Sequence, residues 1–190
     1  MKKIMFSDKY LLTHAVLYGM KTMTRRLLRD NVPLGNWEET VKHLPYKVGD
    51  IVAIAQPYKD IIECMAEYSD IIINVDGSIN REYKAGWTNK MFVRADLLPH
   101  HIRITDVKVE RLQSLSDDEV LREGIYPQRF FNKVEYVFAT MGKMNNTPVH
   151  WLKTFSTPRE AFAALIDKIS GKGTWDNDPW VVAYSFELID

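Results

Sequence analysis

The chain has 190 residues, of which 46% are hydrophobic and 12% aromatic, and its 25 basic and 25 acidic residues cancel. Such a composition excludes a disordered chain, and a net charge of zero excludes the strongly basic surface that binds duplex nucleic acid without specificity. Residues 1–30, however, are rich in Lys and Arg and contain only two acids, Asp8 and Asp30. Any anionic ligand should therefore meet this part of the chain.

Cysteine content and hydropathy bear on the compartment and on cofactors. Cys64 is the only cysteine, which excludes a disulfide within the chain and a thiolate metal cluster. The start, MKKIMFSDKY, lacks the apolar core of a signal peptide, and the longest aliphatic run, residues 71–73, is too short to span a bilayer. We expect a cytoplasmic protein, without metal, cofactor or membrane contact, that folds as a single domain over residues 1–190.

The amino-terminal part predicts a helix followed by an extended segment. Residues 8–18 carry apolar side chains at helical spacing, and Ser7 before them can serve as the N-cap. Gly19 suits the left-handed residue that commonly ends a helix. Residues 22–26 contain two β-branched threonines and therefore favour an extended conformation.

Three β elements are predicted in the middle of the chain. The Gly-Asp turn at residues 49–50 precedes a short apolar strand over residues 51–55. Residues 70–87 predict a hairpin whose two-residue loop is the Asp-Gly pair at 76–77. Residues 100–112 alternate as a strand does, and a one-residue slip near the middle indicates a bulge.

The carboxy-terminal third predicts two helices and a last strand. Ser116 and Glu119 form a capping box at the start of a short helix that ends at Gly124. Residues 158–170 show the same start and stop residues around an apolar stripe. Residues 179–189 are apolar on both faces for half their length, which predicts a central strand.

Residues 126–156 are the least regular part of the sequence. They are rich in aromatic residues and Asn and have few turn residues, so we interpret them as an insertion. A lid, a partly helical segment and an oligomer contact are the alternatives. The order of the elements as a whole indicates a small α+β domain built around a curved sheet or barrel, with short helices packed on the outside.

The segment GMKTMTRR carries the first candidate site residues. In a strand, Thr22, Thr24 and Arg26 share one face, while Met23 and Arg25 share the other and are expected to point away from the site. Two hydroxyls and a guanidinium on one face can bind an oxyanion or the polar edge of a base. The alternative, which the pattern alone favours, is a solvated basic turn.

Lys21, Thr24 and Glu123 are candidates for chemistry. A threonine hydroxyl is a weak nucleophile unless a base takes its proton, and a lysine can be that base only if burial or nearby cations lower its pKa. Glu123 stands at the negative end of a short helix, where a carboxylate is unfavourable, so another purpose is indicated. The alternative is a surface glutamate paired with Arg122 or Lys133.

Aromatic and cationic residues elsewhere complete the candidates. Trp87 and Trp175 can stack a nucleobase, and Arg94 can supply a further cation. Trp180 opens an apolar strand and is expected in the core. The sequence contains no phosphate loop, dinucleotide fingerprint or serine-hydrolase elbow.

Four segments together resemble an ASCH domain of the PUA-like β-barrel type: LYGMKTMTRR, YKVGD, IRITDVKVERLQSLSDDEVLREGI and GTWDNDPWVVAYSFELI. The likeness is to phage and prophage ASCH proteins, which open with a helix and then Gly-x-Lys-Thr-x-Thr-Arg-Arg. The chain departs from them after residues 49–50, where IVAIAQPY replaces a Trp-Val-Arg-Glu-like strand.

This resemblance implies a PUA-like barrel with a central cleft. ASCH domains are generally proposed to bind RNA or nucleotides, and one small bacterial branch is an N4-acetylcytidine amidohydrolase. Its catalytic Lys, Thr and Glu match Lys21, Thr24 and Glu123, with the threonine as nucleophile, the lysine as its base and the glutamate as a proton shuttle. Arg26 also matches the family's arginine.

Three functional hypotheses follow from these patterns. In the first, the protein binds a nucleoside, nucleotide or short single-stranded RNA and hydrolyses an amide such as that of N4-acetylcytidine. In the second, it binds RNA without catalysis, and in the third it is a phage accessory protein that uses the fold only as an interaction surface. Beside the three catalytic candidates, the substrate-binding candidates are Thr22, Arg26, Arg94, Trp87 and Trp175.

Overall fold

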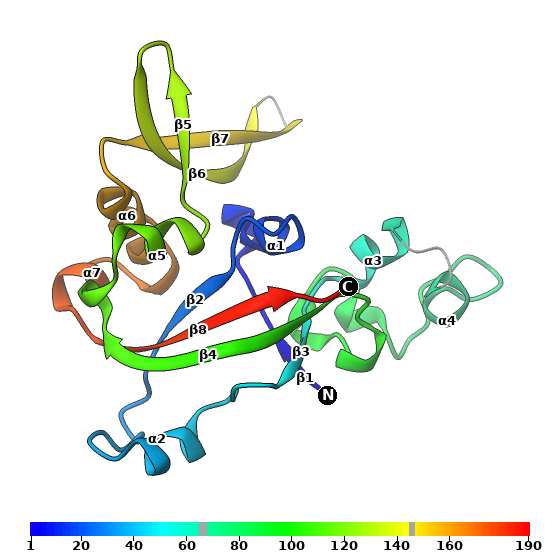
Figure 1. The fold of residues 1–190 in the computed structure, drawn as a ribbon. Coiled ribbons are helices and arrows are strands. Elements are labelled where there is room, and N and C mark those ends of the chain that lie inside the picture. Colours follow the sequence, from blue (N-terminus) through cyan, green and yellow to red (C-terminus); the bar gives the residue numbers. More distant parts are fainter. Residues whose placement is uncertain (65–67, 145–146) are drawn as a thin grey trace. The chain divides into compact units, whose positions relative to one another are not determined.

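The computed structural model of the chain describes residues 1–64, 68–144 and 147–190 (Figure 1). These residues form two compact units. The first unit contains Met1–Phe6, Ile51–Arg103 and Leu188–Asp190, and the second contains Ser7–Asp50 and Ile104–Glu187. Each unit is described by itself below.

The first unit is built on strands β1 (Lys2–Ile4), β3 (Ile51–Ile54) and the start of β4 (His101–Arg111). β1 runs parallel to β3, and β3 runs antiparallel to β4. The strand predicted after the Gly-Asp turn is thus confirmed as β3, and Gly49 adopts the positive φ of 89° that this turn requires. β4 is continuous and continues into the second unit.

Short helices fill the rest of the first unit, and the hairpin predicted over residues 70–87 is reduced to its turn and one antiparallel bridge. The helical elements are α3 (Tyr58–Cys64), α4 (Ser69–Ile72), η3 (Lys84–Gly86), η4 (Lys90–Phe92) and η5 (Ala95–Leu97). Among the described residues, one β-bridge, Ile73 with Ile79, surrounds the turn at Gly77. Ile72 of α4 and Tyr83, the residue before η3, pack with Tyr58 in the core.

The second unit begins with a helix that is shorter than predicted. Leu11 adopts a left-handed conformation, with φ of 52°, and separates the 3-10 turn η1 (Asp8–Tyr10) from α1 (Leu12–Leu17). Ser7 makes no side-chain cap in this arrangement, whereas Gly19 does take the expected left-handed conformation after the helix. α1 buries Leu12, Ala15 and Val16, the apolar face seen in the sequence.

Strands β2 (Met23–Leu27), β8 (Trp180–Leu188) and β4 form the sheet of the second unit. β8 lies between β4 and β2, as Figure 1 shows, so the predicted central position of the last strand is confirmed. β2 runs antiparallel to β8, with Thr24 opposite Tyr184 and Arg26 opposite Val182. Helix α2 (Trp37–His43) follows β2 in the chain.

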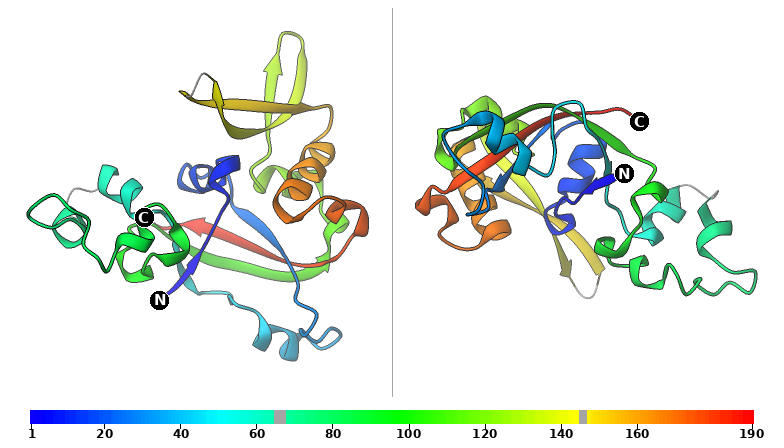
Figure 2. Two further views of the ribbon diagram at one scale, coloured as in Figure 1. Left: turned by 180° about the vertical axis from the view of Figure 1, so that it is seen from behind. Right: turned by 90° about the horizontal axis from the view of Figure 1, so that it is seen from below.

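Both predicted carboxy-terminal helices are present. The capping box of Ser116 and Glu119 starts α5 (Asp117–Arg122), and Gly124 follows it with φ of 95°. α6 (Pro158–Ser170) begins after the N-cap Thr157 and buries Phe162, Leu165 and Ile166. A 3-10 turn, η6 (Leu112–Ser114), precedes α5, and α7 (Thr174–Asn177) leads from α6 into β8, as two further views show (Figure 2).

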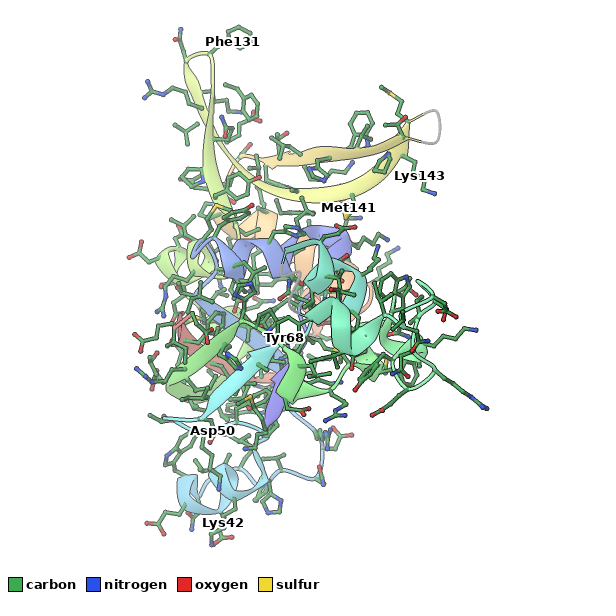
Figure 3. The ribbon with its side chains drawn as sticks, turned by 90° about the vertical axis from the view of Figure 1, so that its right-hand side faces the viewer. Lys42, Asp50, Tyr68, Phe131, Met141 and Lys143 are labelled. Carbon is green, nitrogen blue, oxygen red and sulfur yellow. The ribbon has the colours of Figure 1, made fainter. Side chains whose placement is uncertain are left out.

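The insertion at residues 126–156 is a three-stranded antiparallel sheet. It consists of β5 (Tyr126–Phe130), β6 (Lys133–Met144) and β7 (Thr147–Phe155), in the order β5-β6-β7. Phe131, at the turn between β5 and β6, points away from the strands and is almost fully exposed (Figure 3). Val137 and Phe138 of β6 are buried, and α6 contacts both β6 and β7.

The fold therefore mixes helices with two sheets, and the expected barrel is not formed. Neither sheet closes on itself, because β2 pairs with β8 alone and the chain after Leu27 leaves the edge as a loop. A barrel requires its last strand to pair with its first. Within the described part of the chain, no helix is both long and apolar enough to cross a membrane.

Candidate functional site

Six charged residues of the second unit form what we call the charge cluster. They come from β2 and the residue pair before it, from β4 and from α5, and they are Lys21, Arg25, Lys108, Glu110, Glu119 and Glu123. Three cations thus meet three carboxylates. The acids that GMKTMTRR lacks are supplied by segments about a hundred residues later in the sequence.

The guanidinium of Arg25 is the centre of the charge cluster. Its side chain is completely buried and donates through Nη2 to Glu110 and Glu119, at 2.7 and 2.8 Å, and through Nη1 to Glu123, at 3.0 Å. Nη1 also lies 3.1 Å from the sulfur of Met23. The expectation that Arg25 points away from Glu123 is therefore wrong, and the physical reason is that a buried guanidinium needs several acceptors.

Lys21 and Glu123 form a second buried pair within the charge cluster. Their side chains are 2% and 4% exposed, and Nζ of Lys21 donates to both the carboxylate and the main-chain carbonyl of Glu123, each at 2.7 Å. The second bond caps the carboxyl end of α5. Burial lowers the pKa of Lys21, Glu123 opposes this effect, and the positive charges of Arg26 and Arg25 add to it.

Glu123, whose carboxylate is unfavourable at the end of a helix, thus forms ion pairs with Arg25 of β2 and with Lys21, which lies two residues before this strand. The sequence singled this residue out by its position at the end of the helix, and the structure brings it to Lys21. It does not pair with Arg122, whose Nε instead donates to the hydroxyl of Thr22 at 3.1 Å.

Thr24 and Arg26 lie on the face of β2 opposite to Arg25. Successive side chains of a strand alternate, and cross-strand partners share a face, so Thr24 and Arg26 point to the side of Tyr184 and Val182. Thr24 is 6% exposed, and in the described chain its hydroxyl makes no hydrogen bond to Lys21 or Glu123. The three predicted catalytic residues are close in the fold but are not joined through Thr24.

A cavity of about 410 Å³ opens on the side of Arg26. Its walls come from the end of β2 and the loop after it, from the segment after α2 and from β8, and the residues are Arg26, Leu27, Leu28, Arg29, Val32, His43, Leu44, Pro45, Tyr46 and Val182. We call this the Arg26 cavity. The ring of Tyr46 is fixed edge-on against Tyr184, with centroids 5.3 Å apart, and burial raises the pKa of Tyr184 to about 12.

Two of the substrate-binding candidates belong to the first unit. Trp87 packs against its hydrophobic core. Arg94 is half exposed and forms ion pairs with Glu82 and Asp96, at 3.0 and 2.7 Å. Within that unit, Trp87 is a packing residue, and Arg94 belongs to a network of ion pairs at the surface.

The two tryptophans of the carboxy-terminal part differ from the sequence-based expectation. Trp175 was a candidate for stacking a base, and Trp180 was expected in the core. Trp175 is half-buried, with its ring edge-on to Phe162 at 6.1 Å and Arg159 above it at 5.3 Å. Trp180, expected in the core, is 38% exposed and carries Arg111 over its ring at 4.8 Å. As the first residue of β8, Trp180 lies beside the loop after β2 rather than inside the sheet.

Sequence reasoning missed most of the residues that surround these sites. Glu110 and Glu119 are unremarkable in the sequence, because nothing local relates an acid in a strand or a capping box to Arg25. His43 ends a helix, α2, that the sequence did not predict, and Tyr46 follows it, although Asn36 is its N-cap and accepts from the amide of Glu39. That Asn, followed by two acids in the first turn, is the signal that could have found α2.

Comparisons with known proteins give one structural similarity. No protein-family model and no curated protein sequence matches the chain. Among solved structures, the chain is similar to an ASCH domain from Lactobacillus crispatus JV V101, with 14% identity and a TM-score of 0.38 over 96% of this chain and 75% of that one. A similarity of this size is coarse and does not by itself assign the chain to the ASCH family.

The described residues were also compared with the requirements of a metal site. Over residues 1–64, 68–144 and 147–190, no group of three or more His, Cys, Asp or Glu side chains is arranged to hold a metal ion. The acids of the charge cluster are instead directed at Lys and Arg.

Replacing Arg25 tests the charge cluster. We expect Arg25→Ala to lower the free energy of unfolding by about 3–5 kcal/mol, because it leaves buried carboxylates without their cation. Arg94→Ala is the matched control, since Arg94 also bonds two carboxylates but at the surface, where such pairs contribute little to stability. Urea unfolding followed by circular dichroism measures both. Equal losses in the two variants would contradict the central position of Arg25.

Proposed function

We propose that the protein binds a nucleotide, or one nucleotide of a short single-stranded RNA, in the Arg26 cavity. The observation that carries this proposal is the combination of volume and lining. About 410 Å³ lies within the range of roughly 300–1,000 Å³ that is typical of small-molecule sites. Arg26 and Arg29 supply cations for a phosphate, and Tyr46 supplies an aromatic wall for a base.

The charge of the Arg26 cavity supports an anionic ligand. None of the described residues that line it is acidic, and His43 adds a third nitrogen-bearing side chain to the two arginines. The protein as a whole is neutral, so the lining of the cavity carries a local surplus of positive charge. A phosphate would find donors in this lining, and no lining side chain is a carboxylate that would repel it.

The arrangement of β2 favours binding over catalysis. Arg25 and Lys21 are taken up by the carboxylates of the charge cluster, whereas Arg26 and Thr24 point to the other face of the strand. The resemblance of the sequence to ASCH domains, for which RNA or nucleotide binding is generally proposed, agrees with this division.

Removing the cation of Arg26 tests the proposal. We expect Arg26→Ala to weaken the binding of uridine 5′-monophosphate and to reduce the slope of log affinity against log salt by about one, as for loss of one phosphate contact. Isothermal titration calorimetry at several salt concentrations measures both quantities. Arg129→Ala, an exposed arginine on β5, is the matched control and should bind as the unaltered protein does.

Two results would count against nucleotide binding in this cavity. One is an affinity of the unaltered protein for uridine monophosphate that does not change with salt. The other is an equal loss of affinity in Arg26→Ala and Arg129→Ala, because the cavity would then have no special part in binding. The melting temperature of each variant separates lost binding from lost folding.

Amide hydrolysis is a second candidate, and one observation favours it. Burial lowers the pKa of Lys21, which is the property that a lysine base needs. An apolar cavity of about 280 Å³ is lined by Met20 and Gly124, the chain neighbours of Lys21 and Glu123, so a substrate could approach this pair. Catalysis would first require the bond from Lys21 to the Glu123 carboxylate to open.

The hydrolytic scheme can be tested at the nucleophile. Thr24 Oγ1 would attack the acetyl carbonyl, Lys21 would take the hydroxyl proton, Glu123 would assist departure of the amine, and water would then release the acetyl group from Thr24. If this occurs, Thr24→Ala abolishes release of acetate from N4-acetylcytidine and leaves the melting temperature nearly unchanged. Thr22→Ala is the matched control. Retained turnover in Thr24→Ala would exclude the scheme.

A further inference from the structure

A second cavity adjoins the Arg26 cavity across the loop after β2. It has a volume of about 360 Å³ and is lined by Leu28, Arg29, Asp30, Val32, Leu34, Arg111, Pro179 and Trp180. Three residues, Leu28, Arg29 and Val32, line both cavities. The two cavities therefore lie on either side of one short segment, with Arg29 common to both. We call the second one the Trp180 cavity.

Trp180 is held firmly at the wall of its cavity. Its main-chain oxygen accepts a hydrogen bond from the amide of Leu28 at 3.0 Å, which joins the start of β8 to the loop after β2. The guanidinium of Arg111 lies over its ring at 4.8 Å. Arg111 is itself fixed, because Nη1 donates to the carbonyl of Asp178 at 3.0 Å.

This arrangement is a pre-formed platform for a planar ring. An indole that carries a guanidinium over one face can stack a base on its other face, and the guanidinium can contact the adjoining phosphate, without the cost of ordering a mobile side chain. Trp180 retains 38% of its exposure although Arg111 covers part of it. The Trp180 cavity holds two arginines against one acid, Asp30, so its charge also suits an anion.

The same combination of groups thus occurs twice in succession. The Arg26 cavity pairs Arg26 with Tyr46, the Trp180 cavity pairs Arg111 with Trp180, and Arg29 stands between them. Single-stranded nucleic acid has this repeat of flat base and charged linkage, and proteins that bind it combine aromatic side chains with a basic track. A mononucleotide could fill only one of the two cavities.

We propose that the Arg26 and Trp180 cavities form one groove with two subsites, which binds a single-stranded nucleic acid of at least two nucleotides. Arg29 contacts the phosphate that links the two nucleotides, and Trp180 stacks the base of the second one. This proposal rests on the proposed function of the Arg26 cavity and extends it from one nucleotide to an oligonucleotide.

The test compares a short ligand with a longer one in the full-length protein. Uridine monophosphate and the tetranucleotides U4 and dT4 are titrated into the unaltered protein and into Trp180→Ala by calorimetry. We expect U4 to bind more tightly than the mononucleotide, and Trp180→Ala to weaken U4 about tenfold, within the range for loss of one stacked base. The mononucleotide should bind the variant as before. The comparison of U4 with dT4 distinguishes RNA from DNA as the source of the strand.

Three further variants keep the test decisive. Trp151→Ala, which removes a tryptophan of similar exposure on β7, is the matched control and should leave all affinities unchanged. Trp180→Phe should retain most of the U4 affinity, because phenylalanine can also stack. If Trp180→Ala does not fold, Arg111→Met, at an exposed position, should weaken U4 and spare the mononucleotide.

The outcomes separate this inference from the proposed function. Equal affinities for the mononucleotide and U4, or a Trp180→Ala variant that binds U4 normally, would overturn the second subsite and leave the Arg26 cavity as a mononucleotide site. Absence of binding by all three ligands would overturn both proposals. A loss of U4 affinity as large in Trp151→Ala as in Trp180→Ala would also overturn the second subsite.

Discussion

Arg25 is the residue on which the second unit most depends. A guanidinium has donors on several sides, and burying it is tolerable only when acceptors meet them. Here the acceptors come from β4 and from both ends of α5, so one side chain of β2 joins a strand and a helix that follow it by about 80 to 100 residues. The bond from Lys21 to the main-chain carbonyl of Glu123, just after α5, adds to the same junction.

Because side chains alternate along a strand, the burial of Arg25 on one face of β2 places Arg26 on the other face. Once Arg25 is directed to the charge cluster, Arg26 must point to the opposite face, where the loop after β2 and the segment after α2 leave an open cavity. Two adjacent arginines thus have different environments, one completely buried among carboxylates and one at a cavity without acidic lining. Of the two, Arg26 is the one that lines a cavity.

The sequence predicts those elements whose start and stop residues are local. Three such features were predicted from the sequence, because each depends on residues a few positions apart. They are the capping box of α5, the N-cap and proline of α6, and the glycine turn before β3. The alternation of side chains along β2 was also predicted correctly. The partners of Arg25 were not predicted, because they are three acids from two distant elements, and no local sequence rule relates these acids to Arg25.

Other misses have different physical causes. The three-stranded sheet of the insertion has a turn at Phe131, which adopts a positive φ of 52° without being Gly, Asn or Asp, so the usual turn signal is absent. The segment predicted as a hairpin keeps its turn at Gly77, but its ends enter α4 and η3, because packing against Tyr58 overrides its β-branched composition. Trp180 was assigned to the core by its apolar neighbours, although the first residue of a strand can lie at the edge of a cavity.

The most direct test of this account is a map of where a nucleotide binds. Uridine monophosphate titrated into isotope-labelled protein should change the amide chemical shifts most at residues 26–29, 32, 43, 44 and 46, which line the Arg26 cavity. The amides of Lys21, Glu123 and Gly124, on the side of the charge cluster, should change little. The opposite result, with the largest changes at those three residues and none near Arg26, would contradict the division of β2 into a structural face and a binding face.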